Sequence, residues 1–347
     1  MGQFLSFIPI FFSAQFFRKL ADSKADLEGR TYLVTGSNTG IGLGVAVHLA
    51  RLNPALLILA VRDLDKGAAA KETIIAETDF KGCLEVWELD MASFASVKKF
   101  AERVNTTLER LDGASLNAGI NLWDWRTTDD GWERTLQVND LATGLLGLLL
   151  LPKLQATSKL SHPHTDTALP PPSHLTITGS EGMFLAKFSE KSAPKILEAM
   201  NDKAQCKDIR DRYFTSKLLN LYLAREISKS PHAQGVVVNA ATLMLKCLVW
   251  FPPGLCNTEI ARDLKVPSFV ISLAKRAAFT PSQGALTLLY GLLRDTPPGA
   301  FIYACKITEP PSWTKTKRGL DLQAKVWSEM VEVWRAVAPE VIDLVTV

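Results

Sequence analysis

The sequence has few cysteines, and they are not arranged for a disulfide framework or a zinc site. Its 347 residues include 5 cysteines and 5 histidines, and no two cysteines form a Cys-x-x-Cys pair. Scattered thiols of this kind predict neither disulfides nor a metal centre, so a reducing, intracellular compartment is expected. His162, His164 and His174 flank a proline-rich stretch and are interpreted as loop residues without acid or thiol partners.

The sequence also lacks an excess of charge of one sign. Lysine and arginine number 39 against 36 aspartates and glutamates, and hydrophobic residues make up 47%. A disordered chain would be poorer in apolar residues, and a nucleic-acid-binding chain would gather its basic residues into a stripe. We therefore expect a globular protein with a sizeable core and no nucleic-acid partner.

No uncharged apolar run reaches the length that spans a bilayer, which is about 20 residues. The nearest candidate, residues 4–17, is shorter, contains Pro9 and is followed by Arg18 and Lys19. It can be an apolar arm packed on the body, a segment in a membrane interface, or a cryptic span. Gly2 and Ser6 also match the short pattern for myristoylation. The expected location is cytoplasmic, either free or associated with an intracellular membrane.

Strand-length apolar runs alternate with helix-length periodic segments along most of the chain. The expected strands are residues 31–35, 56–61, 84–87, 113–116, 174–177, 235–239 and 301–304. The expected helices are residues 40–52, 66–77, 94–108, 131–154, 211–228 and 320–336. Repeated β-α-β alternation predicts a doubly wound α/β Rossmann fold, with a single parallel seven-stranded sheet and helices on both faces. Residues 1–27 are assigned to the N-terminal arm and residues 28–347 to a single domain.

A glycine-rich turn lies between the first expected strand and the first expected helix. It reads TGSNTGIG over residues 35–42. Glycines there let the backbone approach a pyrophosphate, and the helix N-terminus supplies N–H donors. The residues expected to bind a dinucleotide are Gly36, Ser37, Asn38, Gly40, Ile41 and Gly42.

The second expected strand, residues 56–61, is followed directly by Arg62 and Asp63. A site that prefers NAD places an acid at this strand tip, whereas an arginine accommodates the 2′-phosphate of NADP. NADP(H) is therefore favoured over NAD. The alternative is that Arg62 is an exposed charge at the entry to a helix.

Tyr213 and Lys217 stand four residues apart in a segment that is helical by pattern. Residues at this spacing share one helix face, so the phenol and the ammonium point into the same space. A nearby cation favours the phenolate and lowers the pKa of a tyrosine from its usual value of about 10. Tyr213 thereby becomes a usable acid–base group near neutral pH.

Taken in order, these motifs resemble the short-chain dehydrogenase/reductase family, in the branch of retinol-dehydrogenase-like enzymes and fungal biosynthetic reductases. The resemblance runs from about Leu27 to Pro339. It rests on residues 35–42, Asp90, Asn117-Ala118-Gly119, Asn139, Ser180, Tyr213–Lys217, and Pro253-Gly254 followed by Thr258.

The resemblance implies a role for each motif residue. Asp90 would contact the adenine, the Asn117 turn the adenosine side, and Thr258 the carboxamide of the cofactor. Asn139, Ser180, Tyr213 and Lys217 would form the catalytic tetrad. In it, Ser180 holds the substrate oxygen, Tyr213 transfers the proton, Lys217 binds the nicotinamide ribose, and Asn139 holds a water that links Lys217 to solvent. Structural alternatives are a helix-interior polar group for Asn139 and a turn cap for Asp90.

Two features depart from the family pattern. A long segment separates Ser180 from Tyr213, and an apolar stretch at residues 241–251 stands before Pro253-Gly254. That stretch is either a wall of the substrate site or an artefact of the gene model. A further surplus segment, residues 158–173, is rich in proline and is interpreted as a surface loop.

The expected activity is NADP(H)-dependent interconversion of a carbonyl and an alcohol. Apolar segments at residues 183–185 and 266–273 favour a lipophilic small molecule, and the resemblance to fungal relatives implies a tailoring enzyme of secondary metabolism. The alternatives are a retinoid- or steroid-type dehydrogenase, and a non-catalytic NADP-binding regulatory protein. The resemblance also implies a homodimer formed through the helices that hold Asn139 and Tyr213.

Overall fold

The computed structural model describes residues 25–161, 171–243 and 280–345. Several sequence predictions lie outside these ranges. They are the arm at residues 4–17, residues 162–170 of the proline-rich segment, residues 244–251 of the apolar stretch, Thr258, and the segment at 266–273.

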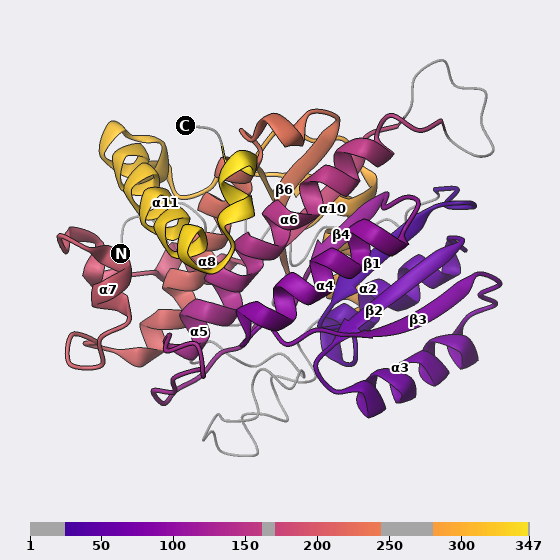
Figure 1. Ribbon diagram of the computed structural model, residues 1–347, viewed down its shortest axis with the longest axis horizontal. Helices are drawn as coiled ribbons and strands as arrows, with labels where there is room; N and C mark the ends of the chain where they lie inside the picture. The colour runs from indigo at the N-terminus through magenta and orange to yellow at the C-terminus, as the bar shows by residue number, and fades with distance from the viewer. Residues whose placement is uncertain (1–24, 162–170, 244–279, 346–347) are drawn as a thin grey trace.

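The described residues contain one eight-stranded sheet, ordered β3-β2-β1-β4-β5-β6-β7-β8 (Figure 1). The strands are β1 Thr31–Thr35, β2 Leu56–Val61, β3 Cys83–Glu88, β4 Gly113–Leu116, β5 Ser173–Ser180, β6 Val236–Leu243, β7 Ala300–Tyr303 and β8 Lys306–Ile307. The first seven are parallel, as predicted. The sequence prediction missed β8, a two-residue strand that pairs antiparallel with β7. Strand order reverses between β1 and β4, which opens a crevice at their carboxyl ends.

Helices cover both faces of the sheet. One face carries α2 Gly40–Arg51, α3 Leu64–Glu77 and α10 Pro281–Leu293, and the other carries α4 Phe94–Thr107, α6 Ala142–Thr157 and α8 Ile209–Ile227. Successive residues of β2 alternate between the two cores, because side chains of a strand point to opposite faces. Leu57 and Leu59 lie in one core, and Ile58 and Ala60 in the other. The Rossmann fold class is confirmed.

The helix predicted over residues 131–154 is interrupted. It consists of a short α5 (Arg134–Leu136), a π turn (η1, Gln137–Leu141) and then α6. Together they form a stretch of 24 residues that is long and apolar enough to cross a membrane, but 94% of its most apolar window is buried in the protein. Its apolar character is therefore explained by burial in the core.

Side chains from three elements bind the backbone carbonyls of the π turn. Thr143 donates to the Val138 carbonyl at 3.0 Å, and Asn220 of α8 donates to the Asn139 carbonyl at 2.6 Å. Trp334 donates to the Leu141 carbonyl at 2.8 Å. π turns widen a helix locally and are frequent at functional sites.

Trp334 belongs to the closing helix α11 (Lys317–Val337), which packs outside α6 and α8. Its ring is fully buried, and a Cβ on Gly144 of α6 would lie only 2.5 Å from it. The glycine thus allows α11 to approach α6 closely.

The predicted homodimer stays a prediction.

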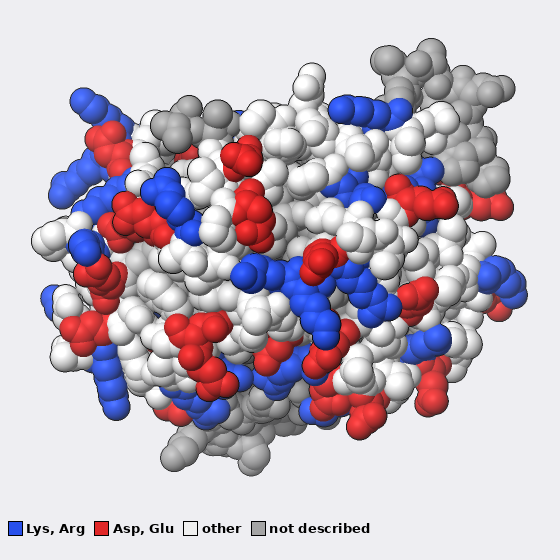
Figure 2. Space-filling view, viewed as in Figure 1, with Lys and Arg blue, Asp and Glu red and all other residues white. Residues whose placement is uncertain are grey.

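On the face where α4 and α11 lie, acidic and basic side chains are interspersed (Figure 2). The ion pair between Arg103 and Glu85 is 4.0 Å long, and both side chains are about half exposed. Exposed pairs contribute about 0–1 kcal/mol each, so the stability of this fold comes from its two cores.

We expect Trp334→Ala to lower the free energy of unfolding by about 3–5 kcal/mol, because it removes a large buried ring and leaves the Leu141 carbonyl with one donor fewer. Urea unfolding followed by circular dichroism measures this. The control is Glu332→Ala, on an outer position of the same helix, which should change stability by less than about 0.5 kcal/mol. Equal effects of the two variants would contradict the packing described for α11.

Candidate active site

The cavity at the carboxyl ends of the strands begins at the turn between β1 and α2. Gly36 and Gly40 have positive φ angles of 65° and 60°. Gly42 lies under the turn, where a Cβ would come within 2.3 Å of the Gly36 carbonyl oxygen. Thr39 precedes the helix without a capping side-chain bond. The first N–H groups of α2 are therefore available for an anion such as a phosphate.

The end of β4 holds this turn in place. The Asn117 side chain donates to the Thr35 carbonyl at 3.0 Å and to the Gly36 carbonyl at 3.3 Å. In return, Thr35 Oγ1 accepts the backbone N–H groups of Asn117 and Ala118, each at 2.9 Å. Asn117 therefore fixes the glycine turn as well as lining the cavity.

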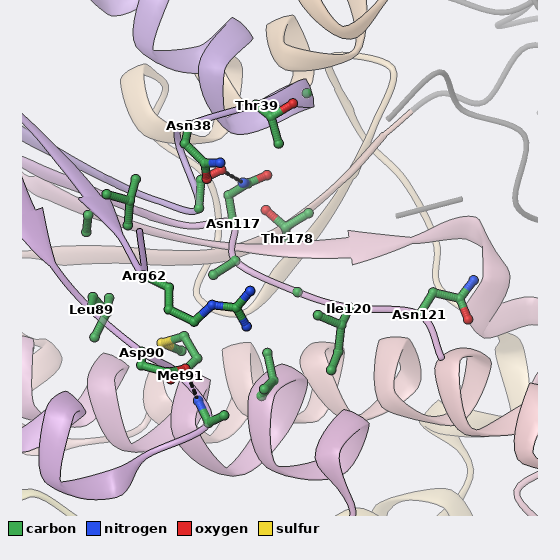
Figure 3. Close-up of a pocket in the computed structure, with 18 of the residues that line it drawn as sticks. Asn38, Thr39, Arg62, Leu89, Asp90, Met91, Asn117, Ile120, Asn121 and Thr178 are labelled. Carbon is green, nitrogen blue, oxygen red and sulfur yellow. Dashed lines mark hydrogen bonds between the residues drawn. The ribbon is translucent and has the colours of Figure 1, made fainter. Parts of the chain in front are cut away.

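Arg62 reaches into the cavity from the end of β2, with Asn38 and Asn117 on one side and Asp90 and Met91 on the other (Figure 3). Asp90 Oδ1 accepts the backbone N–H of Ala92 at 2.9 Å, so Asp90 both lines the cavity and caps the turn. The turn-cap interpretation of Asp90 is therefore confirmed, and its contact with an adenine stays a prediction.

Asp63, next to Arg62, caps the N-terminus of α3. It accepts the backbone N–H of Lys66 at 3.1 Å, and this bond is the main reason that its pKa is lowered. Lys66 also lines the cavity. The strand tip thus presents two cations and one carboxylate, and that carboxylate is bound to the helix terminus.

Tyr213 and Lys217 line the far end of the same cavity, on α8. The Lys217 ammonium lies 5.7 Å from the centre of the Tyr213 ring. It donates to the Thr178 carbonyl at 2.8 Å and to Asn220 Oδ1 at 3.0 Å. Burial lowers the pKa of Lys217 to about 8, against the opposing attraction of the Asp140 carboxylate.

Ser180 stands at the end of β5 and is 3% exposed. Its Oγ accepts the backbone N–H of Gly182 at 3.1 Å. Because this bond uses an oxygen lone pair, the hydroxyl hydrogen can still be donated.

Asn139 lies in the π turn, and both polar atoms of its side chain bind protein groups. Its Oδ1 accepts from Ile120 N at 2.8 Å, and its Nδ2 donates to Ile120 O and to Ser216 Oγ, both at 2.9 Å. Its carbonyl accepts from Asn220. The side chain thus holds the loop after β4 against α8, the helix that carries Tyr213.

The structure brings most of the predicted site residues to one cavity. Gly36, Asn38, Gly40, Ile41, Arg62, Asp90, Asn117, Tyr213 and Lys217 line it. Ser37, Gly42, Asn139 and Ser180 are buried and are not among its lining residues in the described part of the chain.

Sequence reasoning missed other residues of the site. Lys66, Asn121, Arg134 and Thr178 also line the cavity, and Asn220 binds Lys217. The spacing of three residues between Lys217 and Asn220 on one helix could have indicated their contact. The others come from loops and strand ends without a periodic pattern.

The cavity wall fits a long polar ligand. Thr178 Oγ1 and Asn121 Oδ1 are buried without a hydrogen-bond partner among the described residues. Together with the free α2 terminus and the glycine cradle, they suit a dinucleotide. The described residues contain no group of three or more His, Cys, Asp or Glu side chains placed to hold a metal ion.

Comparison with known proteins agrees with this fold. A short chain dehydrogenase family profile matches residues 30–159. The chain is 36% identical over 336 residues to a short chain dehydrogenase/reductase, dmxR8, of Cryptosporiopsis sp. (strain 8999), covering 95% of this chain and 98% of the relative. It is also 36% identical over 290 residues to the short chain dehydrogenase atnD of Emericella nidulans, covering 82% and 86% of the two chains.

Among solved structures, a protein of Mycobacterium Paratuberculosis superposes with a TM-score of 0.61 at 23% identity, over 89% of this chain and 94% of that one. Levodione reductase superposes with a TM-score of 0.54 at 17% identity, over 77% and 91% of the two chains. At these identities the likeness shows the fold alone. Fold and site define a Rossmann-type oxidoreductase. The chain belongs to the short-chain dehydrogenase/reductase family, in its fungal biosynthetic reductase branch.

We expect Gly42→Ala to weaken dinucleotide binding by at least about tenfold, because the added Cβ collides with the Gly36 carbonyl and with Asn117 Nδ2, which holds the turn. Titration of bound nicotinamide fluorescence measures this. The control is Gly131→Asn, at a position with open space around the Cβ and a φ of 84° that asparagine tolerates, which should leave binding unchanged. Undiminished binding in Gly42→Ala would contradict a phosphate site at this turn.

Proposed function

We propose that this protein is an NADP(H)-dependent oxidoreductase that interconverts a carbonyl and an alcohol on a lipophilic small molecule, as a tailoring enzyme of secondary metabolism. The observation that carries the proposal is one shared cavity. It joins the glycine turn and Arg62 at one end to Tyr213 and Lys217 at the other.

Arg62 supports NADP(H) over NAD(H). A guanidinium can bind a 2′-phosphate with two parallel hydrogen bonds, and Lys66 adds a second positive charge to the same wall. The carboxylate that follows Arg62 in the chain, Asp63, is bound to the N-terminus of α3 and to Lys66 at 3.5 Å. It is therefore a poor competitor for a ribose hydroxyl.

Tyr213 is the proton donor of the proposed reduction. When bound, NADPH supplies the hydride for the carbonyl carbon. Tyr213 gives its phenolic proton to the carbonyl oxygen, and the Lys217 ammonium stabilises the phenolate that remains. Ser180 donates its free hydroxyl hydrogen to the same oxygen and so orients the substrate. In the oxidation direction the proton returns to Tyr213.

The segment after Ser180 supports a lipophilic substrate. Met183, Phe184 and Leu185 follow Ser180 in a 3₁₀ turn, and Leu185 is 40% exposed. A retinoid or steroid would suit the same chemistry and remains the alternative substrate class. Contact of residues 4–17 with a membrane surface, a cytoplasmic location and a homodimer are further proposals.

We expect Tyr213→Phe to lower kcat by at least about 100-fold while NADPH binding persists, because only the transferable proton is lost. Reduction of a panel of lipophilic ketones and aldehydes, with NADPH titration in parallel, measures this. The control is Tyr222→Phe on the same helix, whose buried hydroxyl has no partner among the described residues, and which should retain activity. A wild type that binds NADPH but reduces no carbonyl would favour the non-catalytic alternative.

We expect Arg62→Ala to raise the dissociation constant for NADPH by about 10- to 100-fold, because it removes a charge-assisted contact with the 2′-phosphate worth roughly 1.5–3 kcal/mol. The dissociation constant for NADH should change by less than about threefold. Isothermal titration with both cofactors measures this, with Lys71→Ala on α3 as the control. Equal losses for both cofactors would place Arg62 away from the 2′-phosphate.

A further inference from the structure

A buried acid lies beside the lysine of the site and has no part in the proton transfer described above. Asp140 is fully buried in the π turn, and Asn220 and Lys217 of α8 are 1% and 5% exposed. A lone charged group in such surroundings is strongly disfavoured, whereas two opposite charges stabilise one another.

Asn220 connects the two charged groups. Its Oδ1 accepts from the Lys217 ammonium at 3.0 Å, and its Nδ2 donates to Asp140 Oδ1 at 3.2 Å and to the Asn139 carbonyl at 2.6 Å. One amide therefore orients the ammonium on α8 and the carboxylate on the π turn. The second carboxylate oxygen of Asp140 has no hydrogen-bond partner among the described residues.

The other charged groups near Asp140 are already paired. Glu133, at the start of α5, accepts the backbone N–H groups of Thr135 and Leu136 and lies 3.5 Å from Arg212. Arg212 of α8 also binds Glu190 at 3.2 Å. Both Lys217 and Arg212 act on Asp140, and the effect of Lys217 is the larger. Among the described groups, Asp140 is the one carboxylate that acts on Lys217.

We propose that Asp140 is a positioning residue that keeps Lys217 positively charged at neutral pH, with Asn220 as the bridge between them. The proposal rests on the role of Lys217 in the proposed function, because a neutral lysine cannot stabilise the Tyr213 phenolate. Burial raises the pKa of Asp140 and lowers that of Lys217, and each charge opposes this shift in the other. Asn220 holds both groups through one amide, so the charge of each acts on the other across a fixed geometry.

Asp140→Asn tests the proposal with little change of shape, because the amide oxygen can still accept from Asn220. Loss of the negative charge should lower the titration midpoint of Lys217 by about one pH unit. The midpoint is read from the ε-carbon resonance of Lys217 in protein labelled with ¹³C-lysine, assigned by its absence in Lys217→Met. An unchanged midpoint would overturn the proposal, because it would mean that Asp140 is uncharged beside Lys217.

The matched control is Glu133→Gln, which neutralises a second buried carboxylate next to the same turn. Glu133 is paired with Arg212 and acts on Asp140 but not on Lys217. Its loss makes Asp140 easier to ionise, so the Lys217 midpoint should not fall even though the protein is destabilised. If Asp140→Asn does not fold, Asn220→Ala tests the bridge from the other side. It removes an acceptor of the ammonium and should also lower the midpoint, and no shift would again overturn the proposal.

Activity gives a second readout. In the direction of carbonyl reduction, the alkaline limb of kcat against pH should move to lower pH in Asp140→Asn by the same amount as the Lys217 midpoint. If the Lys217 midpoint moves while the alkaline limb of kcat stays, Asp140 does set the charge of Lys217, but that charge does not control proton transfer. This result would contradict the proposed link between the pair and catalysis. A wild type without any reductase activity would refute the proposed function alone, since the resonance still reports the pair.

Discussion

The π turn at Gln137–Leu141 is the constraint on which the site depends. A π turn has one more residue than an α turn, so its carbonyls do not all continue the ordinary helical ladder. Here Thr143, Asn220 and Trp334 donate to three of these carbonyls. One five-residue segment therefore ties together α6, α8 and the closing helix. The same segment places Asn139 against the loop after β4 and Asp140 beside Lys217.

The two ends of the cavity are built by different means. At the proposed cofactor end the backbone shapes the cavity, because glycines leave room for a ligand and Asn117 binds the carbonyls of Thr35 and Gly36. At the proposed catalytic end a charged side chain shapes the cavity, because Lys217 is held in place by the Thr178 carbonyl and by Asn220. The loop after β4 joins both ends, since it begins at Asn117 and is bound at Ile120 by Asn139. This loop is therefore fixed at both ends of the cavity.

Most of the sheet could be predicted from the sequence, and the reason is burial. Strands β1, β2 and β4 match their predicted bounds because buried parallel strands are continuous apolar runs between turn residues. The two-residue β8 has no such pattern. The π turn at Gln137–Leu141 could not be predicted from the sequence either, because all of its residues are buried and the segment therefore has no amphipathic pattern. Among site residues, motif order was enough for Tyr213 and Lys217. Asp140 was missed because its link to Lys217 passes through Asn220, which lies 80 residues further along the chain.

Burial also links the stability of the fold to the charge of the site. The Trp334 ring packs against Gly144 and donates to the carbonyl of Leu141, the residue after Asp140. Asp140 and Lys217 are buried as well, so the medium around them has a low dielectric constant. A low dielectric constant makes an unpaired charge costly and a paired one effective. The burial that stabilises the fold therefore also strengthens the electrostatic effect of Asp140 on Lys217.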